Sequence, residues 1–515
     1  MNPFSGKTKR VVRMMLTLAA LASLLVTAGC VFGGGGNGGG GGGGGGGNQG
    51  FTKASLKGQY AFTLRGIGTP DNLNSFYFVE GGVFTADGNG NITSGIDDFI
   101  ENFTAFSDNI TGIYSINSDG SGNVQFNFPG GGSAAVYRIT LSDDSHFYME
   151  EADPFGTSGG SGEKQDTTAF AAVPAGTFVL QTHDLLEGNS KVGVTTWTSG
   201  NITGTGDVLS GGALISPVTI SGTAQAPGSA TGRGLVTITD DTGTSDYVYY
   251  VVGSSKLRFL NADAVSSLGL GVAEKQTGPF SAASLSGTYV LGSAGETTHV
   301  AGIHTVGMFT TDGISQVTAG SFDFVQDGTP VTNVSLGSTP SSYTVGANGR
   351  AVVTLNLSTG MTNQKVMYLV SPSRAYFLVN DPINVEDGTL DKQTGSAFSN
   401  SSMKGQYALV MDGYDSNQQL PYRDRVGTWT PDGSGSVKTS YVASGYLPTV
   451  PPLEAATLNN LSGTYSVAAN GRTTSSINNL SSNLILYLVS SNSGYMLQAD
   501  NGVDIGGAIT VQTGP

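Results

Sequence analysis

The chain has few of the residues on which many catalytic, disulfide-bonded or nucleic-acid-binding proteins depend. Its 515 residues include one cysteine, four histidines and two tryptophans, and only 12% are charged. One cysteine cannot form a disulfide within the chain, so stability must come from backbone pairing and apolar packing. The 38 acidic residues outnumber the 23 basic ones, which argues against nucleic acid as a partner because that binding needs a basic surface.

The chain also lacks an apolar run long enough to remain as a transmembrane helix. Lysines and arginines in the first 13 residues precede an uncharged run of 15 residues, 14–28, whereas spanning a bilayer takes roughly 20. A basic start, a short apolar core and small residues before a cut site are typical of a secretory signal peptide. We therefore expect residues 1–29 to be an export signal.

The only cysteine stands at the end of this leader. Ala28-Gly29-Cys30 is similar to the lipobox of bacterial lipoproteins, although Thr27 stands where that family prefers leucine. The resemblance implies that Cys30 carries fatty acyl chains, and several such chains anchor stably in a membrane. The expected partner is thus a membrane reached through a lipid anchor, and the expected location is the cell envelope, either the outer membrane or the cell surface.

Glycine fills most of the segment that follows, 30–50. The runs at 33–36 and 38–47 have no side chains to bury and lose much entropy on ordering, so we expect a random coil. About 18 such residues span roughly 20 to 25 Å. The segment is therefore predicted to be a tether that holds the folded part clear of the lipid.

The rest of the chain repeats one unit four times. Leu-x-Gly-x-Tyr openings contain Gly58 and Tyr60, Gly287 and Tyr289, and Gly405 and Tyr407, and a worn copy starts at Phe170. The repeats also share a Phe/Trp-Thr-x-Asp-Gly turn and a closing Lys-Gln or Val-Gln. A period of about 115 residues is too long for a solenoid, whose repeats have roughly 20 to 50. We expect four β-domains at 51–166, 167–279, 280–395 and 396–515, joined by short linkers as independent beads in a semi-rigid rod.

Each unit is predicted to be all-β with about eight antiparallel strands. In the third unit, extended runs are expected at 289–291, 306–310, 316–325, 342–345, 351–357, 365–370, 375–379 and 389–392, separated by turn residues. Asp-Gly and Asn-Gly pairs favour hairpins. Closing such a meander removes both open sheet edges, so the first choice is an up-and-down barrel and the alternative is a two-sheet sandwich.

Two family resemblances follow from these motifs. The Gly-x-Tyr opening is similar to the Gly-x-Trp first strand of lipocalin and avidin barrels, and by that analogy Lys164, Lys275 and Lys392 would cover Tyr60, Phe178 and Tyr289 by cation–π contact. Val511 stands at that position in the fourth unit. More of the chain resembles bacterial surface lipoproteins that repeat Leu-x-Gly-x-Tyr, Phe-Thr-Ala-Asp-Gly-x-Gly and a closing Lys-Gln. That resemblance implies a surface location and no particular activity.

Several stretches have the residue types of a reactive or metal site. Asp87, Asn89 and Asn91 alternate as calcium ligands can, but the matching turns lose the ligands, so a plain hairpin turn is the preferred interpretation. Gly156-Thr-Ser158-Gly-Gly160 matches the Gly-x-Ser-x-Gly sequence of the hydrolase nucleophile elbow. That elbow places its serine between a strand and a helix, whereas we expect this stretch in a loop of an all-β unit, so we interpret the match as coincidence. The histidines, His146, His183, His299 and His304, occupy unmatched positions, which argues against a repeated metal or acid–base site.

Two acidic clusters could in principle supply paired catalytic carboxylates. They comprise Asp97, Asp98 and Glu101, and Glu150, Glu151 and Asp153. Neither recurs in the other units, so we expect solvated acidic faces. The sequence thus favours a non-enzymatic envelope protein without cofactors, which presents β-domains for adhesion or envelope organisation to a glycan or protein. The alternative is a carrier of small apolar molecules, glycans or lipids in barrel pockets.

Overall fold

The computed structural model describes residues 50–68, 76–101, 104–131, 133–152, 156–184, 188–263, 268–297, 302–380, 384–395, 397–415, 422–445, 456–478 and 482–514. The leader, Cys30, nearly all of the glycine tether, Asp153 and His299 lie outside these residues.

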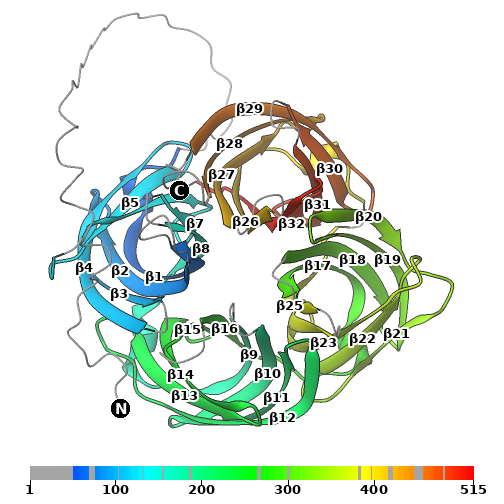
Figure 1. The fold of residues 1–515 in the computed structure, drawn as a ribbon, viewed down its shortest axis with the longest axis horizontal. Helices are drawn as coiled ribbons and strands as arrows, with labels where there is room; N and C mark the ends of the chain where they lie inside the picture. The colour runs from blue at the N-terminus through cyan, green and yellow to red at the C-terminus, as the bar shows by residue number, and fades with distance from the viewer. Residues whose placement is uncertain are drawn as a thin grey trace, which may run out of the picture.

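Four antiparallel β-barrels follow one another along the chain, as the repeats predict (Figure 1). The first contains η2 (Lys53–Ser55), β1 (Lys57–Gly68), β2 (Phe76–Asp87), β3 (Asn91–Glu101), β4 (Thr104–Ile116), β5 (Ser121–Asn127), β6 (Ala135–Leu141), β7 (His146–Glu151) and β8 (Gly156–Lys164). The second contains η3 (Thr167–Ala171), β9 (Gly176–Asp184), β10 (Asn189–Thr198), β11 (Asn201–Ser210), β12 (Ala213–Ala224), β13 (Arg233–Asp240), β14 (Gly243–Gly253), β15 (Lys256–Asn261) and β16 (Gly269–Lys275).

The third and fourth barrels repeat this order. The third contains η4 (Ala282–Ser284), β17 (Ser286–Thr297), β18 (Gly302–Asp312), β19 (Gln316–Gln326), β20 (Thr329–Ser335), β21 (Ser341–Val345), β22 (Arg350–Asn356), β23 (Thr362–Ser371), β24 (Arg374–Asn380) and β25 (Asn384–Lys392). The fourth contains η5 (Asn400–Ser402), β26 (Tyr407–Asp415), β27 (Tyr422–Pro431), β28 (Ser436–Gly445), β29 (Ala456–Val467), β30 (Arg472–Ile477), β31 (Ser482–Ser490), β32 (Ser493–Gln498) and β33 (Val503–Val511).

Each barrel is an up-and-down meander whose first strand pairs with both the second strand and the last. In the first barrel β1 pairs with β2 from Lys57 to Gly68 and with β8 from Tyr60 to Gly68. The third barrel closes in the same way but has nine strands, because its fourth strand is broken into β20 and β21, which both pair with β19. The predicted barrel is confirmed and the sandwich alternative is dropped.

The opening motif seals one end of each barrel. In the first unit Leu56 and Tyr60 are buried, and the Tyr60 hydroxyl donates to the Asp144 carbonyl at 2.7 Å. Gly58 lies between them with φ +124°, and an added Cβ would lie 2.8 Å from Lys164 Cε. The glycine is therefore required both for its backbone angle and for the lysine that crosses it.

The predicted lysine covers are confirmed in part. Lys392 Nζ lies 5.8 Å from the ring centre of Tyr289, within cation–π range. The stems of Lys164 and Lys275 pack against Gly58 and Gly176 at the same place in their barrels. The position is thus a lysine lid over the opening strand in three units.

Apolar side chains fill the barrels. The first core is rich in aromatic rings: Phe84 lies 5.5 Å from Tyr60 and 5.7 Å from Phe126, ring centre to ring centre. The other three barrels have separate clusters of their own, built on Trp197, Phe309 and Trp429 among others. Each repeat therefore has its own core.

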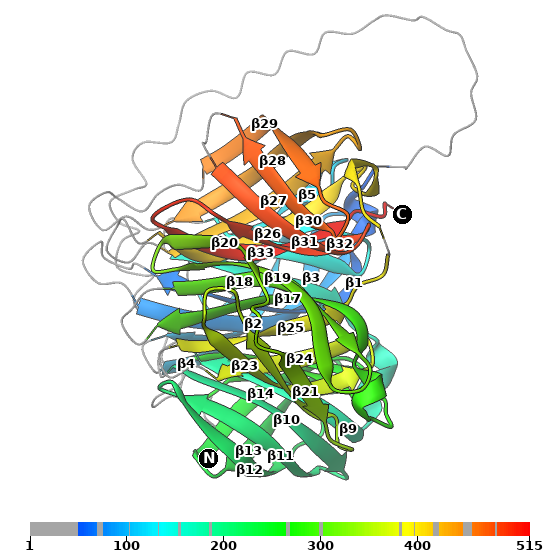
Figure 2. The ribbon, with the colours of Figure 1, turned by 90° about the vertical axis from the view of Figure 1, so that its right-hand side faces the viewer.

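The four barrels form a closed ring, not the expected rod (Figure 1). Turned by 90°, the ring is seen edge-on, with the fourth barrel above and the second below (Figure 2). Apolar clusters of nine, eight and seven buried residues join barrels one to two, two to three and three to four. The rod prediction failed because strands of one barrel carry apolar residues on the outer face as well: Val79 and Ile100 face barrel two, not water.

Candidate functional site

The residues singled out in the sequence are mostly used for structure. The Asp87 carboxylate accepts hydrogen bonds from the backbone N–H groups of Asn89 and Asn91 at 2.6 and 3.0 Å and from the Asn91 side chain at 2.7 Å. These bonds lower the pKa of Asp87 to about 2, the Asn91 side chain contributing most. Asp312 and Asp432 cap their turns in the same manner, so the three matched turns share one hydrogen-bonded form.

Ser158 does not lie in a loop, contrary to the sequence-based expectation. It is in strand β8 and fully buried, facing into the first barrel, while its neighbour Thr157 faces outward to barrel four. The glycines around it provide room: an added Cβ at Gly160 would lie 2.1 Å from the Thr63 carbonyl. The Gly-x-Ser-x-Gly pattern is therefore a close-packed strand.

The acidic clusters are not solvated faces, which corrects a second expectation. Asp97, Asp98, Glu150 and Glu151 are all fully buried. Because side chains alternate along a strand, each adjacent pair is divided between the barrel interior and a junction with another barrel. Asp98 faces barrel two, and Glu150 faces barrel four.

The closing glutamine of each repeat clamps the next barrel. Gln165 Nε2 donates to the carbonyls of Thr231 and Val251, and Gln276 and Gln393 make the same pair of bonds one barrel further on. Gln512, in the last repeat, donates to Asp119 O at 2.9 Å and Leu141 O at 2.6 Å of the first barrel. The contact that joins consecutive units thus also joins the fourth unit to the first, here called the closing junction.

A second contact repeats at three junctions only. Arg233 Nε and Nη2 bind the two oxygens of Asp98 at 2.7 and 2.8 Å, and the Tyr250 hydroxyl donates to Asp98 at 2.6 Å. The same arrangement is formed by Arg350, Tyr368 and Asp207, and by Arg472, Tyr487 and Asp323. We call each of these an Arg–Asp–Tyr cluster. The carboxylate is fully buried in each, and a bidentate guanidinium with a phenol satisfies its charge.

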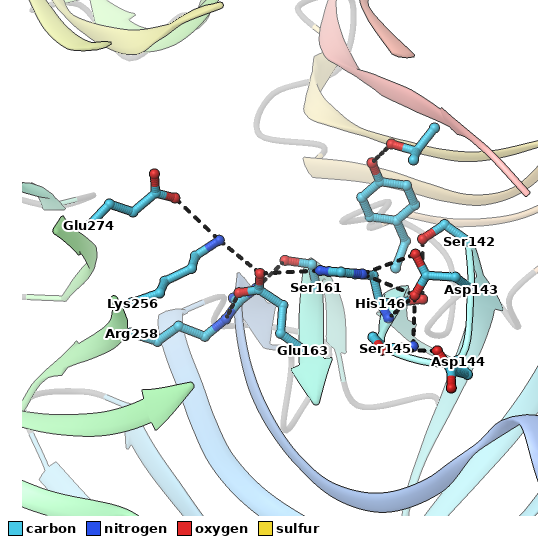
Figure 3. Close-up of polar contacts among 12 residues, drawn as sticks. Ser142, Asp143, Asp144, Ser145, His146, Ser161, Glu163, Lys256, Arg258 and Glu274 are labelled. Carbon is cyan, nitrogen blue, oxygen red and sulfur yellow. Dashed lines mark hydrogen bonds and ion pairs between the residues drawn. The ribbon is translucent and has the colours of Figure 1, made fainter. Parts of the chain in front are cut away.

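A belt of charged and hydroxyl groups runs along the inner side of the ring (Figure 3). Lys256 binds Glu163 at 2.8 Å and Glu274 at 3.4 Å, and Arg258 Nε donates to Glu163 at 3.0 Å. Burial alone would raise the pKa of Glu163, but Arg258 and Lys256 lower it to about 2. His146 joins the same row, 3.0 Å from Asp143 and 3.7 Å from Glu163, and its pKa is raised, chiefly by the hydrogen bond with Asp143.

The belt continues around the ring with changing residues. Arg374 binds Glu274 at 3.0 Å and Asp391 at 3.0 Å, and Tyr495 donates to Asp391 at 2.6 Å. At the closing junction Tyr148 and Thr510 are 2.9 Å apart, hydroxyl to hydroxyl. The contact at this point of the belt is therefore between two uncharged hydroxyls.

A cavity of about 300 Å³ opens at the ring axis, lined by residues of barrels one, two and four. Arg65 and Asp412 meet across it at 2.7 Å, and His183 lies in its wall. These three occupy the same position of the first strand in their barrels, five residues after the opening aromatic. The repeat thus brings unlike residues to one place at the axis, although no single unit contains the set.

Two histidines, His183 and His304, lie near the axis. His183 Nδ1 lies 2.5 Å from Asp387 Oδ2 and 2.8 Å from Ser190 Oγ, so both neighbours share one ring nitrogen, whereas a catalytic triad uses opposite nitrogens. His304 is buried, and burial lowers its pKa to about 4. In the part of the chain that the structure describes, no three histidines, cysteines, aspartates or glutamates gather as a metal site.

The mouth of the second barrel holds a polar pocket of about 330 Å³. Lys191 lies in its wall and forms an ion pair with Asp240, whose side chain is fully buried. Two aspartates, Asp184 and Asp263, also line it, together with His183 and a number of amide and hydroxyl groups. Sequence reasoning missed this pocket because Lys191 reads as an ordinary surface residue until strand register shows that it points inward.

The closing junction differs from the other three at matched positions. Strand register places Ser121, Thr140 and Val442 where the Arg–Asp–Tyr clusters have arginine, tyrosine and aspartate. It places Glu150 where the other junctions have Leu260, Leu378 and Leu497. The apolar cluster here is reduced to Ile67 and Tyr414 with Tyr77 beside them. A cleft of about 340 Å³ lies between barrels one and four at this place.

Glu150 and Asp424 form the polar core of the closing junction. Both are fully buried, and burial raises the pKa of each well above its usual range, with the charge of Asp424 raising that of Glu150 further. Asp424 Oδ2 accepts a hydrogen bond from Thr157 of barrel one at 2.7 Å. This junction therefore favours protonated carboxyls, and one of them, Glu150, stands where the other junctions have leucine.

No protein-family model matches the chain, and no curated protein matches it significantly. Among the described residues, no helix has the length and apolar character needed to cross a membrane.

Proposed function

We propose that this chain is a lipid-anchored binding protein of a bacterial cell envelope and that its four barrels act together as one ring, without catalysis. The observation that carries the proposal is the repeated glutamine clamp, which continues from the last unit back to the first. Four units held in a closed ring present their strand ends in fixed relative positions. A fixed array of exposed loops suits adhesion or envelope organisation, where several weak contacts gain strength together.

The tether joins the ring at the closing junction. Phe51 N donates to Ser118 O at 3.1 Å, and Gly50 lies against Ser118. On the chain, Cys30 stands at the other end of the glycine segment. In this proposal the lipid on Cys30 holds the ring near the membrane.

The anchor is tested by labelling cells with radioactive fatty acid and purifying the protein. We expect label in the native chain and none in Cys30→Ala. Thr27→Leu, which restores the residue preferred in the lipobox, is the matched control and should keep the label. Label that persists in Cys30→Ala would refute the anchor.

A carrier function is the second candidate, favoured by the pocket in the mouth of barrel two. Its volume lies in the range of small-molecule sites, and its polar lining suits a polar ligand better than the apolar one expected from the sequence.

Sedimentation with purified envelope polysaccharide and equilibrium dialysis with extracted small molecules separate the two functions. An adhesive ring sediments, and the combined change of Lys191→Gln and Asp240→Asn leaves sedimentation unchanged. A carrier retains a small molecule that this variant loses. Failure of the native protein to sediment with any envelope polysaccharide would refute the adhesive function.

A further inference from the structure

The closing junction contains a cleft at the place where the other three junctions hold an Arg–Asp–Tyr cluster. In those clusters a guanidinium and a phenol from one barrel fill the space beside a buried carboxylate of the preceding barrel. At the closing junction the matched residues are Ser121, Thr140 and Val442, and all three line the cleft of about 340 Å³. Two large side chains have thus been replaced by small ones, and the carboxylate is gone.

The chemistry of the walls limits what can fill this space. Asp119 already accepts hydrogen bonds from Ser121 N at 3.0 Å and Ser121 Oγ at 2.6 Å, and Val442 replaces the buried carboxylate, so a cation has no strong partner here. The cleft has one carboxylate, Asp119, and one guanidinium, Arg138, and the remaining polar groups are amides and hydroxyls. Neutral groups that donate and accept hydrogen bonds fit such walls best.

Both barrels contribute these groups. Asn123 and Arg138 come from barrel one, and Ser440, Thr457 and Asn459 come from barrel four. Asn123, Thr457 and Asn459 are exposed at its edge. A molecule seated between them contacts both sides of the only junction that has no peptide linker.

We propose that this cleft binds a neutral, hydroxyl-rich saccharide of one or two rings, which takes the space of the missing arginine and tyrosine and holds barrel four against barrel one. The inference rests on the proposed function as a non-catalytic binding protein and names the substrate class and the place. Because the saccharide binds the closed ring and loses half of its contacts in an open one, binding stabilises closure by mass action.

The test uses the mature full chain and three neutral disaccharides as probes: maltose, cellobiose and N,N′-diacetylchitobiose. We expect at least one to bind by calorimetry and to raise the melting temperature. The triple change Ser121→Arg, Thr140→Tyr and Val442→Asp rebuilds the cluster seen at the other junctions. It should fold at least as stably as the native chain and lower the affinity for the probe at least tenfold.

A single variant guards against misfolding of the triple one. Asn459→Trp, at the exposed edge of the cleft, should also lower the affinity for the probe at least tenfold. Thr359→Trp, exposed on a turn of barrel three, should leave that affinity unchanged. The inference is overturned if none of the three probes binds, or if Asn459→Trp leaves the affinity unchanged. Sedimentation with envelope polysaccharide that persists in both cleft variants would overturn this site and leave the proposed function standing.

Discussion

Replacing Gln512 by alanine should open the ring, whereas the same change at Gln276 should not. Both side chains donate two hydrogen bonds to carbonyls of the next barrel, at 2.9 and 2.6 Å for Gln512 and at 3.0 and 2.8 Å for Gln276. The two substitutions therefore remove the same chemistry. They differ in what else holds the junction.

The magnitude follows from the bonds lost. Each hydrogen bond contributes about 0.5 to 1.5 kcal/mol net. In Gln512→Ala the Asp119 carbonyl still accepts a hydrogen bond from Gln406 at 3.2 Å, whereas the Leu141 carbonyl loses its glutamine donor, so the pair represents about 2 to 3 kcal/mol. At the closing junction this corresponds to a shift of roughly 30- to 150-fold from closed toward open rings. At the closing junction the Arg65–Asp412 ion pair, the hydrogen bond from Thr157 to Asp424 and a small apolar cluster remain. At the junction of barrels two and three, eight buried apolar residues, an Arg–Asp–Tyr cluster and a peptide linker remain.

Small-angle X-ray scattering of the mature chain measures the opening, and thermal unfolding measures the stability of the barrels. We expect a larger radius of gyration for Gln512→Ala and a native value for Gln276→Ala, with the barrels folded in both. Equal expansion of the two variants, or no expansion in Gln512→Ala, would refute the view that the closing junction is the weakest.

Further predictions concern the charged groups at the junctions. Because the pKa values of Glu150 and Asp424 are raised in the folded ring, closure takes up protons: it is strongest below about pH 4, the unfolded value, and weakens as pH rises through the folded pKa. The double change Glu150→Gln with Asp424→Asn should make scattering nearly independent of pH, whereas Asp424→Asn alone leaves the pKa of Glu150 raised by burial. His304 has its pKa lowered to about 4, so up to about 3 kcal/mol of stability is lost as pH falls from 6.5 to 4; in His304→Leu the melting temperature should fall less over that range. Arg350→Met leaves Asp207 buried without its cation and should lower the free energy of unfolding by about 3 kcal/mol, measured with denaturant. The double change Arg350→Met with Asp207→Leu should restore most of that free energy, and no recovery would contradict the pairing.

The repeat motifs predicted each barrel but not the ring. The eight extended runs expected in the third unit match its strands, with one run, 351–357, ending a residue beyond β22, because alternation and Asp-Gly turns are local signals. Only β20 (Thr329–Ser335) had no counterpart among them. The interfaces are not local signals. Asp98 and Arg233 are 135 residues apart, and each looks like a surface charge in its own strand.

Some of the junction signal was nevertheless present in the sequence. The closing glutamine is shared by all four units, and a shared polar residue next to a linker marks a contact between units. The carbonyls that accept from it belong to the backbone, so the residue types in the sequence do not reveal which ones they are. The cleft at the closing junction could be found only by comparing Ser121 with Arg233, Arg350 and Arg472, which requires the strand register.

The arrangement around Gly120 bears on how such a chain could have arisen. At the junction of barrels two and three, Gln276 and Phe280 both pack on Gly349, and at the closing junction Gln512 and Phe51, from opposite ends of the folded chain, pack on Gly120 in the same way. Gln512 and Phe51 thus occupy the positions that Gln276 and Phe280 hold on either side of a peptide linker. We expect a gene rearranged to begin at Phe398 and to join residue 515 to Phe51 to encode the same ring without residues 1–50, so that any of the four copies can stand first in the ring.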